Sequence, residues 1–119
     1  MSIQRIHPGR RLSQAVLHLD TVYVAGIVAD DTSAGVIGQT REILAKLERV
    51  LAEAGSDKSR LLSATVWLAD AGSYDEMNSV WDAWVSPGAA PARACVEAKL
   101  AKTEYRVEVA AIAARDGGG

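Results

Sequence analysis

The sequence contains no phenylalanine, a single cysteine and only three prolines in 119 residues. One cysteine cannot form a disulfide within the chain, so the reducing cytoplasm is the expected location. The formal net charge of −2 gives no basic excess for binding the phosphates of nucleic acid. No apolar run approaches the roughly 20 residues that a membrane-spanning helix needs. Neither nucleic acid nor a membrane is therefore an expected partner.

Several catalytic motifs are also absent. There is no glycine-rich phosphate loop and no nucleophile elbow. The two histidines, His7 and His18, have no partners at metal-ligand spacing, so no metal site is expected. What is present is typical of a folded globular protein, with 49% hydrophobic and 24% charged residues. A chain of this length is expected to form one domain, residues 1–119, with a flexible glycine-rich tail at 115–119.

Apolar periodicity predicts six strands and two helices. Alternating residues indicate strands near 3–6, 15–19, 22–25, 61–69, 92–98 and 106–113. Apolar residues at three- and four-residue spacing indicate helices at 36–54 and 73–85. Ser73 and Glu76 form a capping-box pattern at the start of the second helix. This order of elements predicts an α+β fold, a mixed six-stranded sheet with both helices on one face.

The fifth of these strands carries the most informative residues. Alternation places Arg93 and Cys95 on one face and the alanines of the strand on the other. A guanidinium near the start of a strand of small residues can hold a carboxylate by two parallel hydrogen bonds. The alternative is a solvated surface arginine. Cys95 is either a nucleophile or an inert thiol in a pocket wall, and no histidine lies nearby in sequence to activate it.

Glu108 lies in the last strand, on the face that it shares with Ala110 and Ile112. A carboxylate in such a partly apolar setting suits a proton carrier, and the alternative is a glutamate in a salt bridge. Because the helices cover only one face of the sheet, the opposite face must be wet or covered by something else. Arg93, Cys95 and Glu108 are expected to make that opposite face partly polar.

The chain resembles one known family along most of its length. Pro91-Ala92-Arg93, followed by Cys95-Val96-Glu97 and the final strand at 106–113, is similar to the signature end of the Rid family, also called the YjgF family. Earlier segments agree in order, so that the resemblance extends from about residue 3 to residue 113. The agreeing segments are Val24-Ala25-Gly26, Gln39-Thr40, residues 64–70 and Met77-Asn78-Ser79-Val80-Trp81. Residues 68–70, 77–78 and 81–85 are more similar to the YoaB-type branch than to RidA itself.

The resemblance implies a chorismate-mutase-like homotrimer, with a cleft at each subunit boundary. It also implies an enzyme of metabolite damage control that hydrolyses reactive enamines or imines to 2-keto acids and ammonia, without a metal or an organic cofactor. Arg93 would hold the substrate carboxylate, and Glu108 would position or activate the attacking water. Backbone groups near Gly26 and Cys95 would orient the substrate. Asn78 would border the pocket, although its position on the helix also fits an exposed polar residue.

A second interpretation stays open: a non-catalytic trimer that senses small carboxylates through the same Arg93. An endoribonuclease role, attributed to some relatives, is disfavoured by the net charge of −2. Two segments differ from the archetype of the family. Ala25 stands where a serine is frequent, and Leu12-Ser13-Gln14 occupies a region that carries a tyrosine there. Both differences bear on the identity of the substrate.

Overall fold

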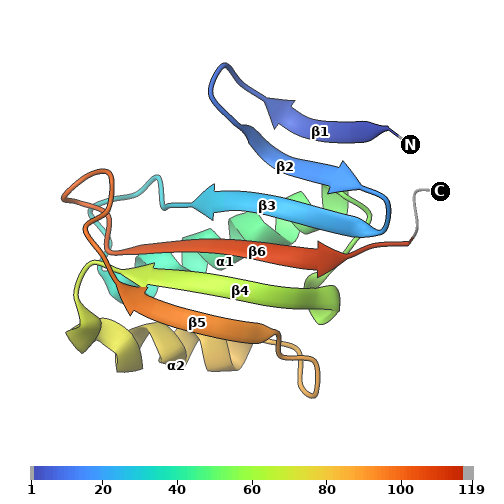
Figure 1. The fold of residues 1–119 in the computed structure, drawn as a ribbon. Helices are drawn as coiled ribbons and strands as arrows, with labels where there is room; N and C mark the ends of the chain where they lie inside the picture. The colour runs from blue at the N-terminus through green and yellow to red at the C-terminus, as the bar shows by residue number, and fades with distance from the viewer. Residues whose placement is uncertain (1, 117–119) are drawn as a thin grey trace.

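The structure is a computed structural model that describes residues 2–116. It contains the predicted elements in the predicted order (Figure 1). The strands are β1 (Ile3–Pro8), β2 (Ser13–His18), β3 (Thr21–Ile27), β4 (Leu61–Leu68), β5 (Ala92–Glu97) and β6 (Val107–Ala114). The helices are α1 (Val36–Glu53) and α2 (Tyr74–Trp84), with short 3₁₀ turns at Lys58–Arg60 and Ala71–Ser73. Of the tail predicted at 115–119, residues 117–119 lie outside the described part of the chain.

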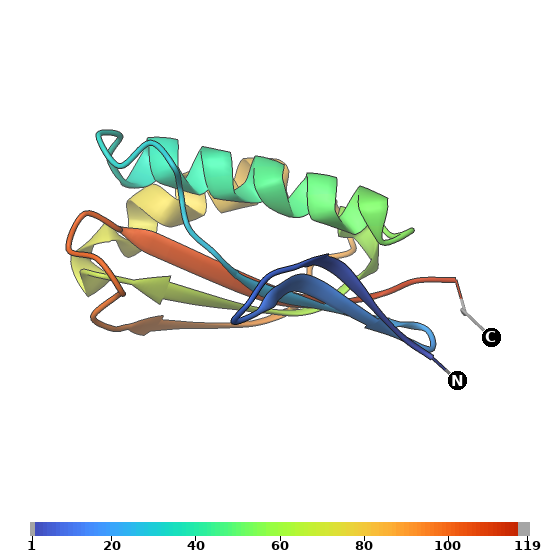
Figure 2. The same cartoon turned by 90° about the horizontal axis from the view of Figure 1, so that it is seen from above.

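The six strands form one sheet in the order β1-β2-β3-β6-β4-β5. Only β4 and β5 run parallel, and α2 provides the crossover connection that such a pair requires. Both helices lie on the same face of the sheet, as Figure 2 shows from above. The predicted mixed six-stranded sheet with two helices on one face is therefore confirmed.

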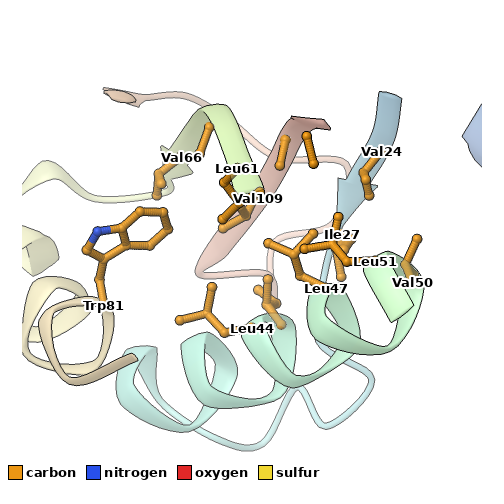
Figure 3. Close-up of a cluster of buried hydrophobic side chains, with 14 of the residues drawn as sticks. Val24, Ile27, Leu44, Leu47, Val50, Leu51, Leu61, Val66, Trp81 and Val109 are labelled. Carbon is orange, nitrogen blue, oxygen red and sulfur yellow. The ribbon is translucent and has the colours of Figure 1, made fainter. Parts of the chain in front are cut away.

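The hydrophobic core fills the space between the helices and the sheet (Figure 3). The apolar stripe of α1 supplies fully buried side chains, among them Ile43, Leu47 and Leu51. Alternate residues of β6, beginning with Val107 and Val109, face this stripe and are equally buried. Each such aliphatic side chain contributes about 1.5–3 kcal/mol of transfer free energy. The core thus fixes which face of each strand points toward the helices.

The opposite face of the sheet carries no helix (Figure 2). Strand register places Trp67 opposite Glu108 and Ser63 opposite Ile112 on this face. It includes exposed apolar surface, since Tyr23 and Val96 are each 46% exposed. We call this surface the open face. The open face carries both apolar and polar side chains, and no helix of residues 2–116 covers it.

The prediction that Arg93 and Cys95 lie on the open face is wrong. Parallel pairing sets Arg93 beside Ala64 and Cys95 beside Val66, and both of these β4 residues are buried under the helices. Arg93 and Cys95 therefore point toward α2. Period-two alternation divides a strand into two faces, but it does not say which face meets the helices. Only Glu108, of the three residues assigned to the open face, lies there.

The predicted capping box at the start of α2 does not form. The Ser73 hydroxyl donates to the carbonyl oxygen of Asp70 at 2.6 Å and makes no bond to the helix. The Asp70 side chain in turn accepts from the backbone N–H of Gly72 at 2.8 Å. These bonds close the 3₁₀ turn at Ala71–Ser73, which directly precedes α2, so that the Ser73 hydroxyl is used in the turn and not as a helix cap. Competition between a local turn and a helix cap explains the difference.

Candidate functional site

The candidate residues fall into two separate groups. The first, which we call the arginine cluster, comprises Arg93 of β5 and the α2 residues Tyr74, Met77, Asn78 and Trp81. These four helical positions follow the spacing i, i+3, i+4, i+7, so their side chains lie on one face of α2. The parallel register of β4 and β5 directs the Arg93 side chain onto that face.

Neutral groups hold the Arg93 guanidinium on three sides. Its Nη1 donates to Asn78 Oδ1 at 2.8 Å, and its Nη2 donates to Tyr74 Oη at 3.2 Å. Its Cζ lies 5.0 Å from the ring centroid of Trp81 and 5.8 Å from that of Tyr74, which allows cation–π attraction to both rings. Arg93 is half-buried, so it is not a freely solvated strand residue.

No carboxylate lies within ion-pair distance of Arg93 among residues 2–116. A guanidinium carries five N–H donors. One is used by Asn78, one by Tyr74, and a weak contact of 4.0 Å joins Nη1 to Met77 Sδ. At least two donors and the full positive charge remain available. This arrangement is suited to a carboxylate ligand, because such a ligand takes two parallel N–H bonds from one arginine.

Cys95 follows Arg93 on the same face of β5 and packs against the edge of the core. Burial raises the pKa of its thiol above the usual range, and the nearby Arg93 charge only partly opposes this effect. His7 and His18 lie on β1 and β2, at the far side of the sheet, so neither can act as its base. The interpretation as an inert thiol in a wall fits this environment better than a nucleophile does.

The second group, the glycine–glutamate corner, comprises Ala25 and Gly26 of β3 and Glu108 of β6. The register between β3 and β6 shifts between Val24 and Ile27, which marks an irregularity at Ala25 and Gly26. A Cβ atom at position 26 would overlap Oε2 of Glu108, so the absence of a side chain lets the carboxylate lie against the backbone. The register of β3 with β2 ends at Val24, so the regular ladder between these two strands stops just before Ala25 and Gly26.

Glu108 is half-buried on the open face, between Gly26 of β3 and Trp67 of β4. No cation of the described chain lies within ion-pair distance of its carboxylate. The salt-bridge alternative is therefore not realised within residues 2–116. The carboxylate instead lies against Gly26, and the half-buried side chain is partly exposed to solvent on the open face.

A cavity of about 550 Å³ adjoins this corner, and Ala25 and Gly26 form part of its lining. Its walls come from the β1–β2 loop, the end of β3 and the C-terminal half of α1, and they include Leu12, Gln14 and Arg49. Lys46 also lines it, but the Lys46 ammonium is already bonded to the carbonyl oxygen of Val28 at 2.9 Å. The same ammonium lies 3.0 Å from an Asp30 oxygen.

The arginine cluster and the glycine–glutamate corner lie far apart within one chain. Arg93 is on the edge strand β5, and Gly26 is on β3, with β4 and β6 between them. Three steps of about 4.8 Å make a separation of roughly 14 Å across the sheet. Glu108 is closer in strand order but lies on the opposite face from Arg93. The structure brings Arg93 together with Asn78 and Cys95, and Gly26 together with Glu108, but it does not unite the two groups.

Sequence reasoning missed Tyr74 as a partner of Arg93 and treated Met77 and Trp81 only as core residues. The signal was present in the shared i, i+3, i+4, i+7 spacing of these residues with Asn78. It could be used only once β5 was known to run parallel to β4 beneath α2. Among the described residues, no group of three or more His, Cys, Asp and Glu side chains could hold a metal ion. In residues 2–116 no helix has the length and apolarity to cross a membrane.

Comparison with known proteins identifies the family. A family model described as Endoribonuclease L-PSP matches residues 2–115. The chain therefore belongs to this family, the YjgF or Rid family that its sequence resembles. The crystal structure of a YjgF-family protein from Neisseria meningitidis is 44% identical and superposes with a TM-score of 0.92, covering 97% of this chain and 96% of that one.

Curated relatives sharpen the position within the family. The RutC family protein YoaB of Escherichia coli is 42% identical over 114 residues, which is 96% of this chain and 99% of that protein. The 2-iminobutanoate/2-iminopropanoate deaminase of Mus musculus is 33% identical over 107 residues, covering 85% of this chain and 78% of that protein. The greater similarity to a YoaB-type relative confirms the branch predicted from residues 68–85.

Proposed function

We propose that the protein is a Rid-type deaminase that hydrolyses reactive enamines or imines of amino acids to 2-keto acids and ammonia. The observation that carries this proposal is the half-buried Arg93, held in place by neutral partners and unpaired with any carboxylate of residues 2–116. A half-buried cation that keeps free N–H donors is suited to bind an anionic ligand. The name of the mouse relative, a 2-iminobutanoate/2-iminopropanoate deaminase, supports an imino acid as that ligand.

The proposed active unit is a homotrimer in which each site combines two protomers. Within one chain, Arg93 and Glu108 lie on opposite faces of the sheet and cannot reach one ligand. The arginine cluster of one protomer would therefore lie against the glycine–glutamate corner of the next. The open face supports this assembly, because burying the exposed side chains of Tyr23 and Val96 against another copy would lower the free energy of the assembled state. A carboxylate bound at Arg93 would then place the C=N carbon of the substrate near Glu108.

In the proposed reaction, Arg93 binds the substrate carboxylate and Glu108 acts as general base. Glu108 takes a proton from water while the water oxygen bonds to the C=N carbon and the π-electron pair moves to nitrogen, and Glu108 then passes this proton to the nitrogen and is ionised again. The resulting carbinolamine collapses when the C–N bond breaks, the C=O bond forms and a proton from the hydroxyl passes to the departing ammonia. An enamine first takes a proton on carbon and loses one from nitrogen, which gives the imine. Backbone groups at Ala25 and Gly26, where the regular ladder between β3 and β2 has ended, would orient the substrate.

The test is turnover of imines generated in the assay by an amino-acid oxidase. We expect the protein to speed the formation of keto acid and ammonia above the spontaneous rate in a matched reaction without it. Light scattering of the same sample should give the mass of a trimer. Binding of pyruvate without any acceleration would instead support the carboxylate-sensing alternative. Neither binding nor acceleration would refute both functions.

A further inference from the structure

The proposed reaction makes no use of the hydroxyl group of Tyr74. Its oxygen accepts a hydrogen bond from Arg93 Nη2 at 3.2 Å. A phenol oxygen that accepts one bond still carries its own proton, which it can donate elsewhere. No acceptor for that proton occurs among residues 2–116. Tyr74 is 45% exposed, so the proton is accessible beside the free N–H groups of Arg93.

We propose that Tyr74 is a second ligand-binding residue of the carboxylate site, in which its hydroxyl donates to an oxygen of the carboxylate held by Arg93. This inference rests on the proposed function, because it requires an anion at Arg93. The two residues form a clamp with three donors: two N–H groups of the guanidinium and the phenolic O–H. An ionised carboxylate has about four lone-pair sites, so it can accept all three.

The contacts around Arg93 favour such a clamp. Asn78 holds one terminal nitrogen of the guanidinium and Tyr74 holds the other, so the plane of the fork is fixed from both ends. The Tyr74 ring also lies near the guanidinium carbon, with 5.8 Å between the centroid and Cζ. The ring therefore helps to hold the cation, while the hydroxyl extends the donor set toward the ligand. These two contributions can be separated, because phenylalanine keeps the ring and removes only the hydroxyl.

The first experiment compares the trimeric parent protein with Tyr74→Phe by calorimetric titration with pyruvate and 2-oxobutyrate. Loss of a hydrogen bond to a charged group predicts roughly tenfold weaker binding. In imine turnover the same variant should show a raised KM and a nearly unchanged kcat, because the hydroxyl contacts the carboxylate in both the ground state and the transition state. Tyr105→Phe is the matched control, since Tyr105 precedes β6 in a loop outside the cluster. It should bind both acids like the parent.

A second variant separates direct donation from mere support of Arg93. Replacing Tyr74 with 3-fluorotyrosine makes the phenol more acidic, hence a better donor and a poorer acceptor. At a pH where the phenol remains protonated, direct donation predicts tighter pyruvate binding than in the parent. A role limited to accepting from Arg93 predicts equal or weaker binding, and that result would overturn the inference.

The outcomes also distinguish this inference from the proposed function. If Tyr74→Phe binds pyruvate like the parent while Arg93→Ala does not bind it, the clamp is wrong and the carboxylate site stands. If Tyr74→Phe and Tyr105→Phe are weakened equally, the effect is not specific to the clamp and the inference also fails. If Arg93→Ala binds pyruvate as tightly as the parent, both the clamp and the proposed function fail.

Discussion

The arginine cluster and the glycine–glutamate corner are built by different means. In the cluster, one helix face supplies four side chains that hold a cation supplied by the neighbouring strand. In the corner, an irregular strand and a missing side chain let a carboxylate lie against bare backbone. The cluster is thus built from side-chain contacts, whereas the corner depends on the absence of a side chain at position 26. The proposed function assigns binding to the cluster and chemistry to the corner, so each half can be disabled separately.

Glu108→Gln should give the largest loss. The amide keeps the size of the side chain but cannot take a proton from water, and general base catalysis contributes about 10²–10⁴-fold in rate. We expect kcat for imine turnover to fall within that range while calorimetry shows unchanged affinity for pyruvate. A variant that retains full turnover would remove Glu108 from the reaction and leave the corner without its assigned task.

Arg93→Ala should weaken pyruvate binding by about ten- to a hundredfold, because a charge-assisted contact is worth about 1.5–3 kcal/mol. Arg93→Lys should recover only part of this loss, since lysine offers a single charge on a flexible stem and no planar fork. Calorimetry measures both effects, and light scattering should show that each variant still assembles like the parent. Equal affinity in Arg93→Ala and the parent would place the carboxylate site elsewhere.

Gly26→Ala tests the space in the corner. The added methyl group would overlap the Glu108 carboxylate and displace it, so we expect roughly a tenfold loss of kcat, since misplacing a catalytic group by about 1 Å can cost up to a hundredfold. Gly35→Ala is the matched control, because a Cβ there meets nothing within 4 Å. Comparable losses in the two variants would mean that the corner has no special need for glycine.

Cys95→Ala should give the smallest effect, with most turnover retained, because the thiol serves as part of a wall. The raised pKa of Cys95 means that its thiolate forms only at higher pH than in a free cysteine. Alkylation by iodoacetamide should therefore be slower at pH 8 than that of a cysteine peptide. Its rate should increase mainly at pH values above the range in which a free cysteine titrates. Fast labelling at neutral pH, or complete loss of turnover in a folded Cys95→Ala protein, would identify a nucleophile instead.

The arrangement of the fold could be predicted from the sequence because its elements have strong and distinct periodicities. The α1 stripe and the alternation in β6 both face one core, so element type and order follow from burial alone. The identity of Arg93 and Glu108 as candidate residues also came from sequence, through local setting and family resemblance. Their separation did not, because the alternation of β5 is symmetric between its two faces.

Other features of the site depend on contacts that are distant in sequence. The irregularity at Ala25 and Gly26 arises where β3 pairs with β6, which comes from the far end of the chain. The contact between Tyr74 and Arg93 requires α2 to lie over β5 in one particular register. The failed cap at Ser73 reflects a local competition with the Asp70 turn, and patterns of residue type do not rank such alternatives.

The crossover from β4 through α2 to β5 has a consequence for the order of folding. Arg93 and Tyr74 are only 19 positions apart, and the connection that makes the parallel pair also carries the residues that hold the arginine. The corner must instead wait until the two ends of the chain meet, which carries a larger loop-closure cost. We therefore expect amide protons of α2 to be protected from hydrogen exchange earlier in refolding than those of β3, as pulse labelling would measure. The segment that carries the arginine cluster would then be assembled first, and the strands of the glycine–glutamate corner would be added to it.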